Sequence, residues 1–161
     1  MPTTSINDNN ISPIAQDLLG GSLDLEITYG LVEAKRIDYP YGAGVSLVKG
    51  EWGVLQADGT IARATGTPAK ASFLVFAGND RYDSRATGML TMIVNSAIVA
   101  KTVYYDDTAS LAPGDGLTVK LLAVGANSGK SGLAKASGAE PVHAYVNYVS
   151  GGVLVYDVAP R

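Results

Sequence analysis

The chain of 161 residues is predicted to be all-β: a small β-sandwich or barrel of about ten short strands, with an N-terminal arm and one short helix. Beyond residue 21 the hydrophobic period is two rather than 3.6, and in residues 22–28 Leu23, Leu25 and Ile27 alternate with polar residues. Val, Thr, Tyr and Ile dominate these segments, and glycine-containing turns separate them. Short strands at this spacing are typical of sandwiches and barrels.

Residues 1–21 are expected to form the arm, and residues 22–161 the β-domain. Residues 1–11 are polar and without periodicity, which is typical of a terminus that is flexible or ordered by a partner. Ser12 offers an N-cap before a proline at the first helical position, and two glycines at 20–21 provide a stop. We therefore expect a helix over residues 13–19, which is too short to be stable in water unless it docks.

The β-domain is expected to continue after residues 22–28 with further strands and defined turns. The strands are expected at residues 45–48, 52–56, 61–64, 72–76, 89–94, 98–105, 117–122, 142–149 and 153–158. Asp58-Gly59 predicts a type I′ hairpin, residues 113–116 a tight turn and Gly151-Gly152 the final hairpin. Residues 125–139, rich in Gly, Ser, Ala and Lys, indicate an exposed loop with room for a short strand at 133–136.

Composition excludes several classes of function. The 12 basic and 15 acidic residues give a net charge of −3 and form no run, whereas a nucleic-acid binder needs a clustered basic face. The absence of cysteine excludes disulfides, thiolate zinc sites and cysteine nucleophiles, and a single histidine excludes a two-histidine metal site. No apolar run reaches the ~20 residues that a membrane span needs, so we expect no membrane-spanning segment. No secretory signal is recognisable, so we expect no signal peptide.

Two motifs suggest chemistry but favour a structural interpretation. Gly125–Ser131 has three residues between its glycines where a phosphate-binding loop needs four, and no helix follows, so it favours a surface loop without cofactor. His143 lies in an alternating strand beside Tyr145, with no recognisable nucleophile or orienting acid, which favours a polar residue on a sheet face or at a subunit contact.

Acidic and aromatic residues supply the remaining candidates. The acidic pairs, Asp80 with Asp83 and Asp106 with Asp107, favour turn and rim positions over a hydrolase or calcium site. Trp52, the single tryptophan, is expected in the core or at a seam. Exposed tyrosines can anchor a protein interface or stack on a sugar, and the first use is favoured here. The candidate interface tyrosines are Tyr39, Tyr41, Tyr104 and Tyr105.

The order of turn and strand motifs resembles a known family. One half holds Gly50-Glu51-Trp52, then Asp58-Gly59, then Arg63-Ala64-Thr65. The other half holds PGDGLTV at 113–119, GLAKA at 132–136 and GAEPV at 138–142, followed by a closing hairpin. This pattern, over roughly residues 50–158, resembles the small head decoration (cement) proteins of tailed bacteriophages. In these proteins a GDxLTV turn and strand, a GxLxxA strand and a GxPVxAxV strand recur near the C-terminus.

The resemblance implies a non-enzymatic structural protein on the exterior of a virion, assembled in the host cytoplasm. Such a protein binds the major capsid protein as a homotrimer or dimer, bridges its subunits and stabilises the expanded shell. An arm ordered on contact can add a strand to a capsid edge, and we assign its apolar anchors to Ile6, Ile11, Ile14 and Leu18. The alternatives are a tail or fibre module, a carbohydrate-binding β-module that uses the tyrosines, and a hydrolase that uses the acidic pairs.

Overall fold

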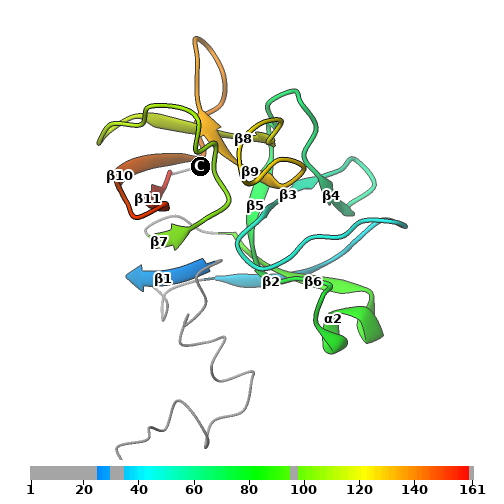
Figure 1. Cartoon of the computed structure of the whole chain (residues 1–161). Coiled ribbons are helices and arrows are strands. Elements are labelled where there is room, and N and C mark those ends of the chain that lie inside the picture. Colours follow the sequence, from blue (N-terminus) through cyan, green and yellow to red (C-terminus); the bar gives the residue numbers. More distant parts are fainter. Residues whose placement is uncertain (1–24, 30–34, 95–97, 160–161) are drawn as a thin grey trace, which may run out of the picture.

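Within residues 25–29, 35–94 and 98–159, which the computed structural model describes, the chain forms eleven strands and one short helix. The strands lie in two antiparallel sheets (Figure 1), and the predicted class, a small all-β sandwich, is confirmed. The six-stranded sheet has the order β1 (Leu25–Tyr29), β7 (Val99–Thr102), β11 (Val153–Val158), β10 (Ala144–Ser150), β8 (Gly116–Leu121), β9 (Ser131–Lys135). The five-stranded sheet has the order β2 (Arg36–Pro40), β6 (Met89–Ile93), β5 (Ser72–Ala77), β3 (Trp52–Leu55), β4 (Ile61–Arg63).

Ten of the eleven strands overlap predicted ranges, and β2 is the one that was missed. Its exposed charged residues, Arg36 and Asp38, and its proline interrupt the apolar alternation, as is common in edge strands.

The predicted strand at 45–48 is wrong. The Asn79 side chain accepts a hydrogen bond from the Leu47 N–H at 3.0 Å and donates one to the Val45 carbonyl at 2.5 Å. A side-chain amide therefore satisfies backbone groups that a strand would have paired.

The helix α2 (Tyr82–Thr87) was not predicted, because six residues are too few to show a helical period. It ends at Gly88, which has a φ of 69° and donates its N–H to the Ser84 carbonyl. The predicted helix over residues 13–19 and the predicted boundary between arm and β-domain lie outside the described residues.

The five-stranded sheet is buried on both faces, which explains the continuous apolar sequence of β5. One face packs against the six-stranded sheet around Trp52, which is 1% exposed, as the core interpretation predicted. The other face packs beneath the segment at residues 41–48. The residues of this second core are Leu47, Ile61, Phe73, Val75, Leu90 and Met92.

The six-stranded sheet curls towards a barrel at the end that carries β9. The chain that follows β7 returns beside β9, where the Leu133 N–H donates to the Tyr104 carbonyl at 3.1 Å and the Asp106 N–H donates to the Leu133 carbonyl at 2.9 Å. These bonds make a parallel bridge between Tyr105 and Leu133. The sequence predicted an exposed loop with a short strand in this region, but β9 is a sheet strand whose first four residues are buried.

Two of the three predicted turns are confirmed. Gly151 and Gly152, with φ of 59° and 76°, connect Ser150 to Val153 in a two-residue hairpin, and the turn at 113–116 closes through an Asp115 N–H bond to Ala112. The predicted hairpin at Asp58-Gly59 does connect β3 to the antiparallel β4, but its predicted type I′ turn is wrong. The Gly59 N–H donates to the Gln56 carbonyl, so Gly59 follows the turn instead of lying at its centre. Two bonds from Thr60 hold the Asp58 carboxylate in this loop and lower its pKa.

The buried phenol of Tyr156 makes stability sensitive to alkali. Burial raises the pKa of Tyr156, so above about pH 10 the unfolded chain ionises this group while the folded chain keeps it neutral. The free energy of unfolding therefore falls as pH rises. We expect Tyr156→Phe to reduce the loss of stability between pH 8 and pH 11 by about 1.4 kcal/mol, measured by urea denaturation. Tyr148→Phe, at an exposed site, is the control, and an equal loss in wild type and Tyr156→Phe would contradict the prediction.

Candidate functional site

The four arm residues chosen as capsid anchors, Ile6, Ile11, Ile14 and Leu18, lie outside the described residues. Their assignment stays a prediction. The structure does place the four tyrosines proposed as interface residues, and it separates them into two pairs with different surroundings.

Tyr39 and Tyr41 lie at the end of β2 and pack against the second core, where both are partly buried. The Tyr39 ring stacks on Phe73 with ring centroids 5.5 Å apart and an interplanar angle of 13°. Tyr41 forms an isolated bridge with Ile61, which covers the outer edge of β4. Both tyrosines therefore contribute to packing and present only part of their surface to a partner.

Tyr104 and Tyr105 are buried, with 9% and 4% exposure, so the expectation of an exposed pair is wrong. The chain that carries them turns inward beside β9, and Tyr105 joins the main core. Burial and the nearby charge of Asp107 raise the pKa of Tyr105. The Tyr104 ring lies 5.4 Å from the Lys130 ammonium, a cation–π distance.

Among the tyrosines whose burial the structure describes, three others are exposed. Tyr82 on α2 is 76% exposed, while Tyr145 and Tyr148 on β10 are 43% and 50% exposed. The sequence did not single out these residues as a site. The alternation of β10 placed Tyr145 opposite the apolar face, but nothing in the sequence placed Tyr148 beside it.

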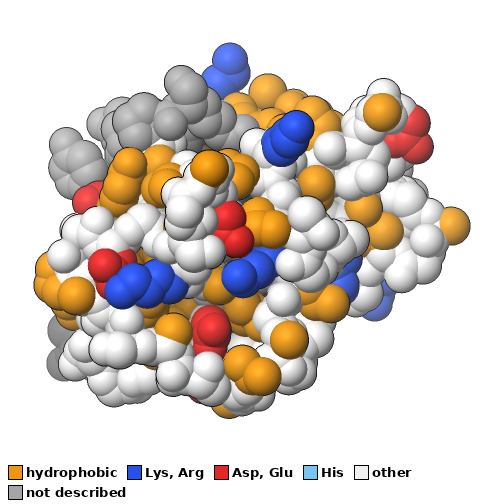
Figure 2. Space-filling model, turned by 90° about the horizontal axis from the view of Figure 1, so that it is seen from above, with side chains coloured by type: hydrophobic (Ala, Val, Ile, Leu, Met, Phe, Trp, Pro, Cys, Tyr) orange, Lys and Arg blue, Asp and Glu red, His pale blue; other side chains and the backbone are white. Residues whose placement is uncertain are grey.

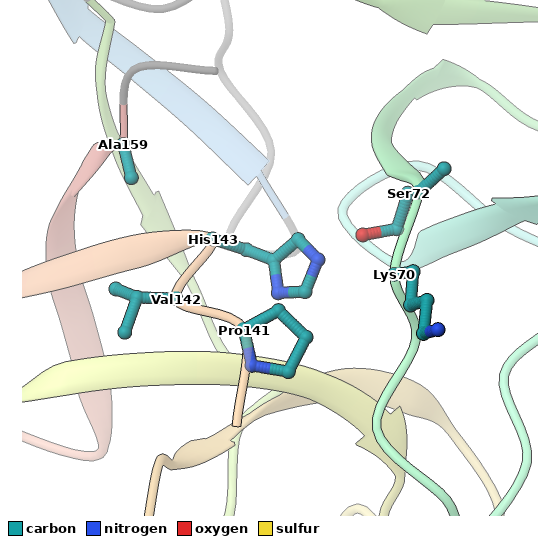
Figure 3. Close-up of a pocket in the computed structure, with 7 residues that line it drawn as sticks. Lys70, Ser72, Pro141, Val142, His143 and Ala159 are labelled. Carbon is teal, nitrogen blue, oxygen red and sulfur yellow. The ribbon is translucent and has the colours of Figure 1, made fainter. Parts of the chain in front are cut away.

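His143 lines a half-open cavity of about 240 Å³ between the segment before β5 and the segment before β10 (Figure 3). Its Nδ1 accepts a hydrogen bond from the Val119 N–H at 3.3 Å, and its ring meets Trp52 edge to face with centroids 6.2 Å apart. Lys70 and Ser72 lie across the cavity, and the other lining residues are Ala71, Pro141, Val142 and Ala159. None of these lining residues is an acid that could orient the imidazole, so the cavity does not supply a catalytic triad.

The glycine-rich loop uses its own N–H groups within the protein. Three of these donors bond to carbonyls of the loop or of Leu122, and the N–H groups of Ala126 and Ser131 bond to Asp107 and Glu51. A phosphate-binding loop needs such donors directed at the ligand. The contacts of this loop therefore agree with the surface-loop interpretation.

The acidic pairs occupy turns and rims. Asp106 accepts bonds from the N–H and hydroxyl of Thr108, Asp107 accepts one from the Ala126 N–H, and Asp83 lies in the first turn of α2. Among the described residues, no group of three potential metal-ligating side chains occurs. These contacts favour the structural interpretation of both pairs over a hydrolase or calcium site.

Sequence reasoning missed a buried polar group with several hydrogen bonds, the side chain of Glu51. This carboxylate is fully buried and accepts bonds from Arg63 Nη1, the Ser131 N–H and the Val48 N–H, each at 2.9 Å. Arg63 also donates to the carbonyls of Ser46 and Gly129. The network joins β3, β4 and β9, so it connects the two sheets. Its only sequence signal is the position of Glu51 between Gly50 and Trp52.

On the face seen from above, the described residues form no extended patch of one charge. Figure 2 shows basic and acidic side chains lying close to one another on this face, with apolar groups between them. An ion pair joins Lys135 to Asp115 at 2.8 Å, and the hydrogen bond from Lys135 lowers the pKa of Asp115. Such a mixed surface does not favour a polyanionic ligand.

In comparisons with known proteins, no family model, no curated protein and no solved structure matches the chain. Across the described part of the chain, no helix has both the length and the apolar character needed to cross a membrane.

Proposed function

We propose that this protein is a structural component of a bacteriophage virion that binds the outer surface of the capsid. In this role it bridges major capsid protein subunits and stabilises the expanded shell. Because the protein binds only the expanded form of the shell, its binding shifts the equilibrium towards that form by mass action. Many bound copies add their effects. The proposal involves no catalysis and no cofactor.

The observation that carries this proposal is the meeting of the segments on which the family resemblance rests. The Gly50-Glu51-Trp52 segment and Arg63 come from the first half of the pattern, and the GLAKA strand from the second. In the folded chain Glu51 bonds to both Arg63 and Ser131, the residue directly before that strand's glycine. The Ser131 hydroxyl also donates to the Trp52 carbonyl. Part of the resemblance therefore falls on residues next to the contact that joins the two sheets, while other motifs, such as Asp58-Gly59 and residues 113–116, lie in turns.

The charge distribution supports a binding role for the arm. Residues 1–24 contain three of the 15 acidic residues and none of the 12 basic ones, so residues 25–161 hold 12 of each sign. The arm, residues 1–21, thus combines apolar anchors with two acidic residues and no basic one, beside a β-domain, residues 22–161, that has 13 acidic and 12 basic residues. Its partner surface should be apolar with a basic rim, and its binding should weaken as salt rises.

Deletion of residues 2–20 tests the role of the arm. We expect loss of co-sedimentation with expanded capsids that lack this protein, because the deletion removes all four anchors and both acidic residues of the arm. Circular dichroism and thermal unfolding should match the wild type. A second variant, with Ile6, Ile11, Ile14 and Leu18 all changed to Ser, keeps the chain length and should bind at least roughly 100-fold more weakly. Unchanged capsid binding in both variants would refute the role of the arm.

The copy number in purified virions separates the capsid role from a tail or fibre role. Quantitative peptide mass spectrometry should find this protein in numbers comparable to the major capsid protein. A few copies per particle would assign it to the tail or to a vertex instead, and its absence from virions would refute the proposal.

A further inference from the structure

The cavity beside His143 has polar groups on one side and apolar groups on the other. Figure 3 shows the imidazole of His143, from the segment before β10, directed towards Ser72, the first residue of β5. The two polar atoms, His143 Nε2 and Ser72 Oγ, are buried. A ligand between them would therefore meet both atoms away from bulk water, where hydrogen bonds and charges act more strongly.

One hydrogen bond determines which nitrogen of the imidazole carries hydrogen. His143 Nδ1 accepts a bond from the Val119 N–H at 3.3 Å, so Nδ1 carries no hydrogen. The imidazole is then neutral and holds its hydrogen on Nε2, the nitrogen that Figure 3 shows on the side of Ser72. A ligand atom that meets His143 in the cavity must therefore be a hydrogen-bond acceptor.

Lys70 adds a positive charge to the same side of the cavity. It lies two residues before Ser72 in the chain, and its side chain is exposed. Among the described residues, its ammonium forms no ion pair and no acidic residue lines the cavity. The flexible stem of a lysine lets its ammonium follow a bound anion. An imidazole N–H, a hydroxyl and an ammonium thus favour an anionic acceptor, which makes charge-assisted hydrogen bonds.

The other walls of the cavity suit the hydrocarbon part of a ligand. Pro141, Val142 and Ala159 contribute apolar groups. The volume of about 240 Å³ is larger than the roughly 150 Å³ in which a protein cavity holds a benzene ring. Small-molecule sites commonly combine apolar walls with a few polar groups that orient the ligand. The cavity therefore has the size and the lining for a whole small molecule.

We propose that this cavity binds a small organic monocarboxylate. Its carboxylate accepts hydrogen bonds from His143 and Ser72 and pairs with Lys70, and its hydrocarbon part lies against the apolar wall. A neighbouring groove shares Lys70 and Pro141 with the cavity and also carries Glu140, whose negative charge opposes anions of higher charge, such as phosphate. The inference does not require the capsid proposal, because all the residues on which it rests belong to the β-domain of one chain.

NMR of the full-length protein can observe this site directly, because His143 is the single histidine of the chain. Without ligand, the imidazole nitrogens should show the neutral tautomer with hydrogen on Nε2. Sodium benzoate, at constant pH and ionic strength, should shift the His143 signals until they saturate, with a Kd on the order of 1 mM. Benzamide has nearly the same shape without the charge and should bind at least about 10-fold more weakly. Inorganic phosphate should give no saturable shift.

Two lysine variants with the same change in net charge test the role of Lys70. Lys70→Glu places a carboxylate beside the cavity and should weaken benzoate binding at least about 10-fold. Lys120→Glu, on β8 and outside the cavity lining, should bind benzoate like the wild type. Ser72→Ala removes one donor and should weaken binding about 5-fold. Circular dichroism of each variant establishes that it is folded, and the exposed position of Lys70 keeps that variant informative if Ser72→Ala does not fold.

Four outcomes would overturn the inference. They are an imidazole that carries its hydrogen on Nδ1, no saturable shift with benzoate up to roughly 20 mM, equal affinity for benzoate and benzamide, and equal weakening by Lys70→Glu and Lys120→Glu. None of these results changes the capsid proposal, which the arm deletion and the copy number in virions test.

Discussion

Replacing Glu51 with alanine is expected to lower the free energy of unfolding by about 3 kcal/mol, because it removes a fully buried carboxylate that accepts three hydrogen bonds, one of them from the partly exposed Arg63. The change leaves the N–H groups of Val48 and Ser131 without their acceptor, and it removes the carboxylate that pairs with the Arg63 guanidinium. Each buried donor without a partner costs free energy of its own. The loss should appear as a lower denaturation midpoint in urea with an unchanged slope.

The matched control is Glu140→Ala. Glu140 accepts one hydrogen bond, from the Ser137 N–H at 2.8 Å, in an exposed turn, so its removal should cost less than about 1 kcal/mol. A variant that changes Glu51 and Arg63 together to methionine should be more stable than Glu51→Ala, because no charged guanidinium is left beside an apolar site. If Glu51→Ala and Glu140→Ala cost the same, the Glu51 network does not hold the sheets together.

Gly132→Ala is expected to destabilise the protein by about 3 kcal/mol, at the upper end of the cost of overpacking. A Cβ atom at Gly132 would lie 2.5 Å from the Tyr104 carbonyl oxygen and 2.8 Å from a methyl group of Leu122. The first contact is with backbone, which cannot move away as a flexible side chain does. The chain after β7 would have to separate from β9, and the parallel bridge that curls the six-stranded sheet would open.

Gly66→Ala provides the control for this change, since a Cβ atom at Gly66 meets nothing within 4 Å. Its effect on thermal unfolding should be close to zero or slightly stabilising, because alanine restricts the unfolded chain. Native-state hydrogen exchange adds a local measurement, in which the Leu133 and Asp106 amides lose protection in Gly132→Ala before the rest of the sheet. Equal stability of the two alanine variants would show that the close approach at Gly132 is not required.

Periodicity predicted the parts of this fold in which the burial of each side chain follows its position in a strand. β10 begins with buried Ala144, exposed Tyr145 and buried Val146, as alternation requires. The apolar run of β5 gave the correct strand, and only the structure shows that it lies between two cores. In each of these segments the local pattern and the tertiary environment agree.

The prediction failed where contacts distant in sequence determine the outcome. Residues 45–48 have a strand-like composition, but Asn79, more than thirty residues away, supplies their hydrogen bonds. Tyr104 and Tyr105 were predicted to be exposed interface residues, yet the return of the chain beside β9 buries them.

The sequence by itself determined the class of fold, most of its strands and two of its three predicted turns, and it placed Trp52 in the core or at a seam. These features depend on the period of apolar residues and on turn residues that lie next to one another in the chain. Only the tertiary structure decided that Glu51 joins the two sheets and that His143 faces Ser72 across a cavity. A buried carboxylate needs donors from several segments, and a cavity forms between segments far apart in the chain, so neither can be read from one segment alone.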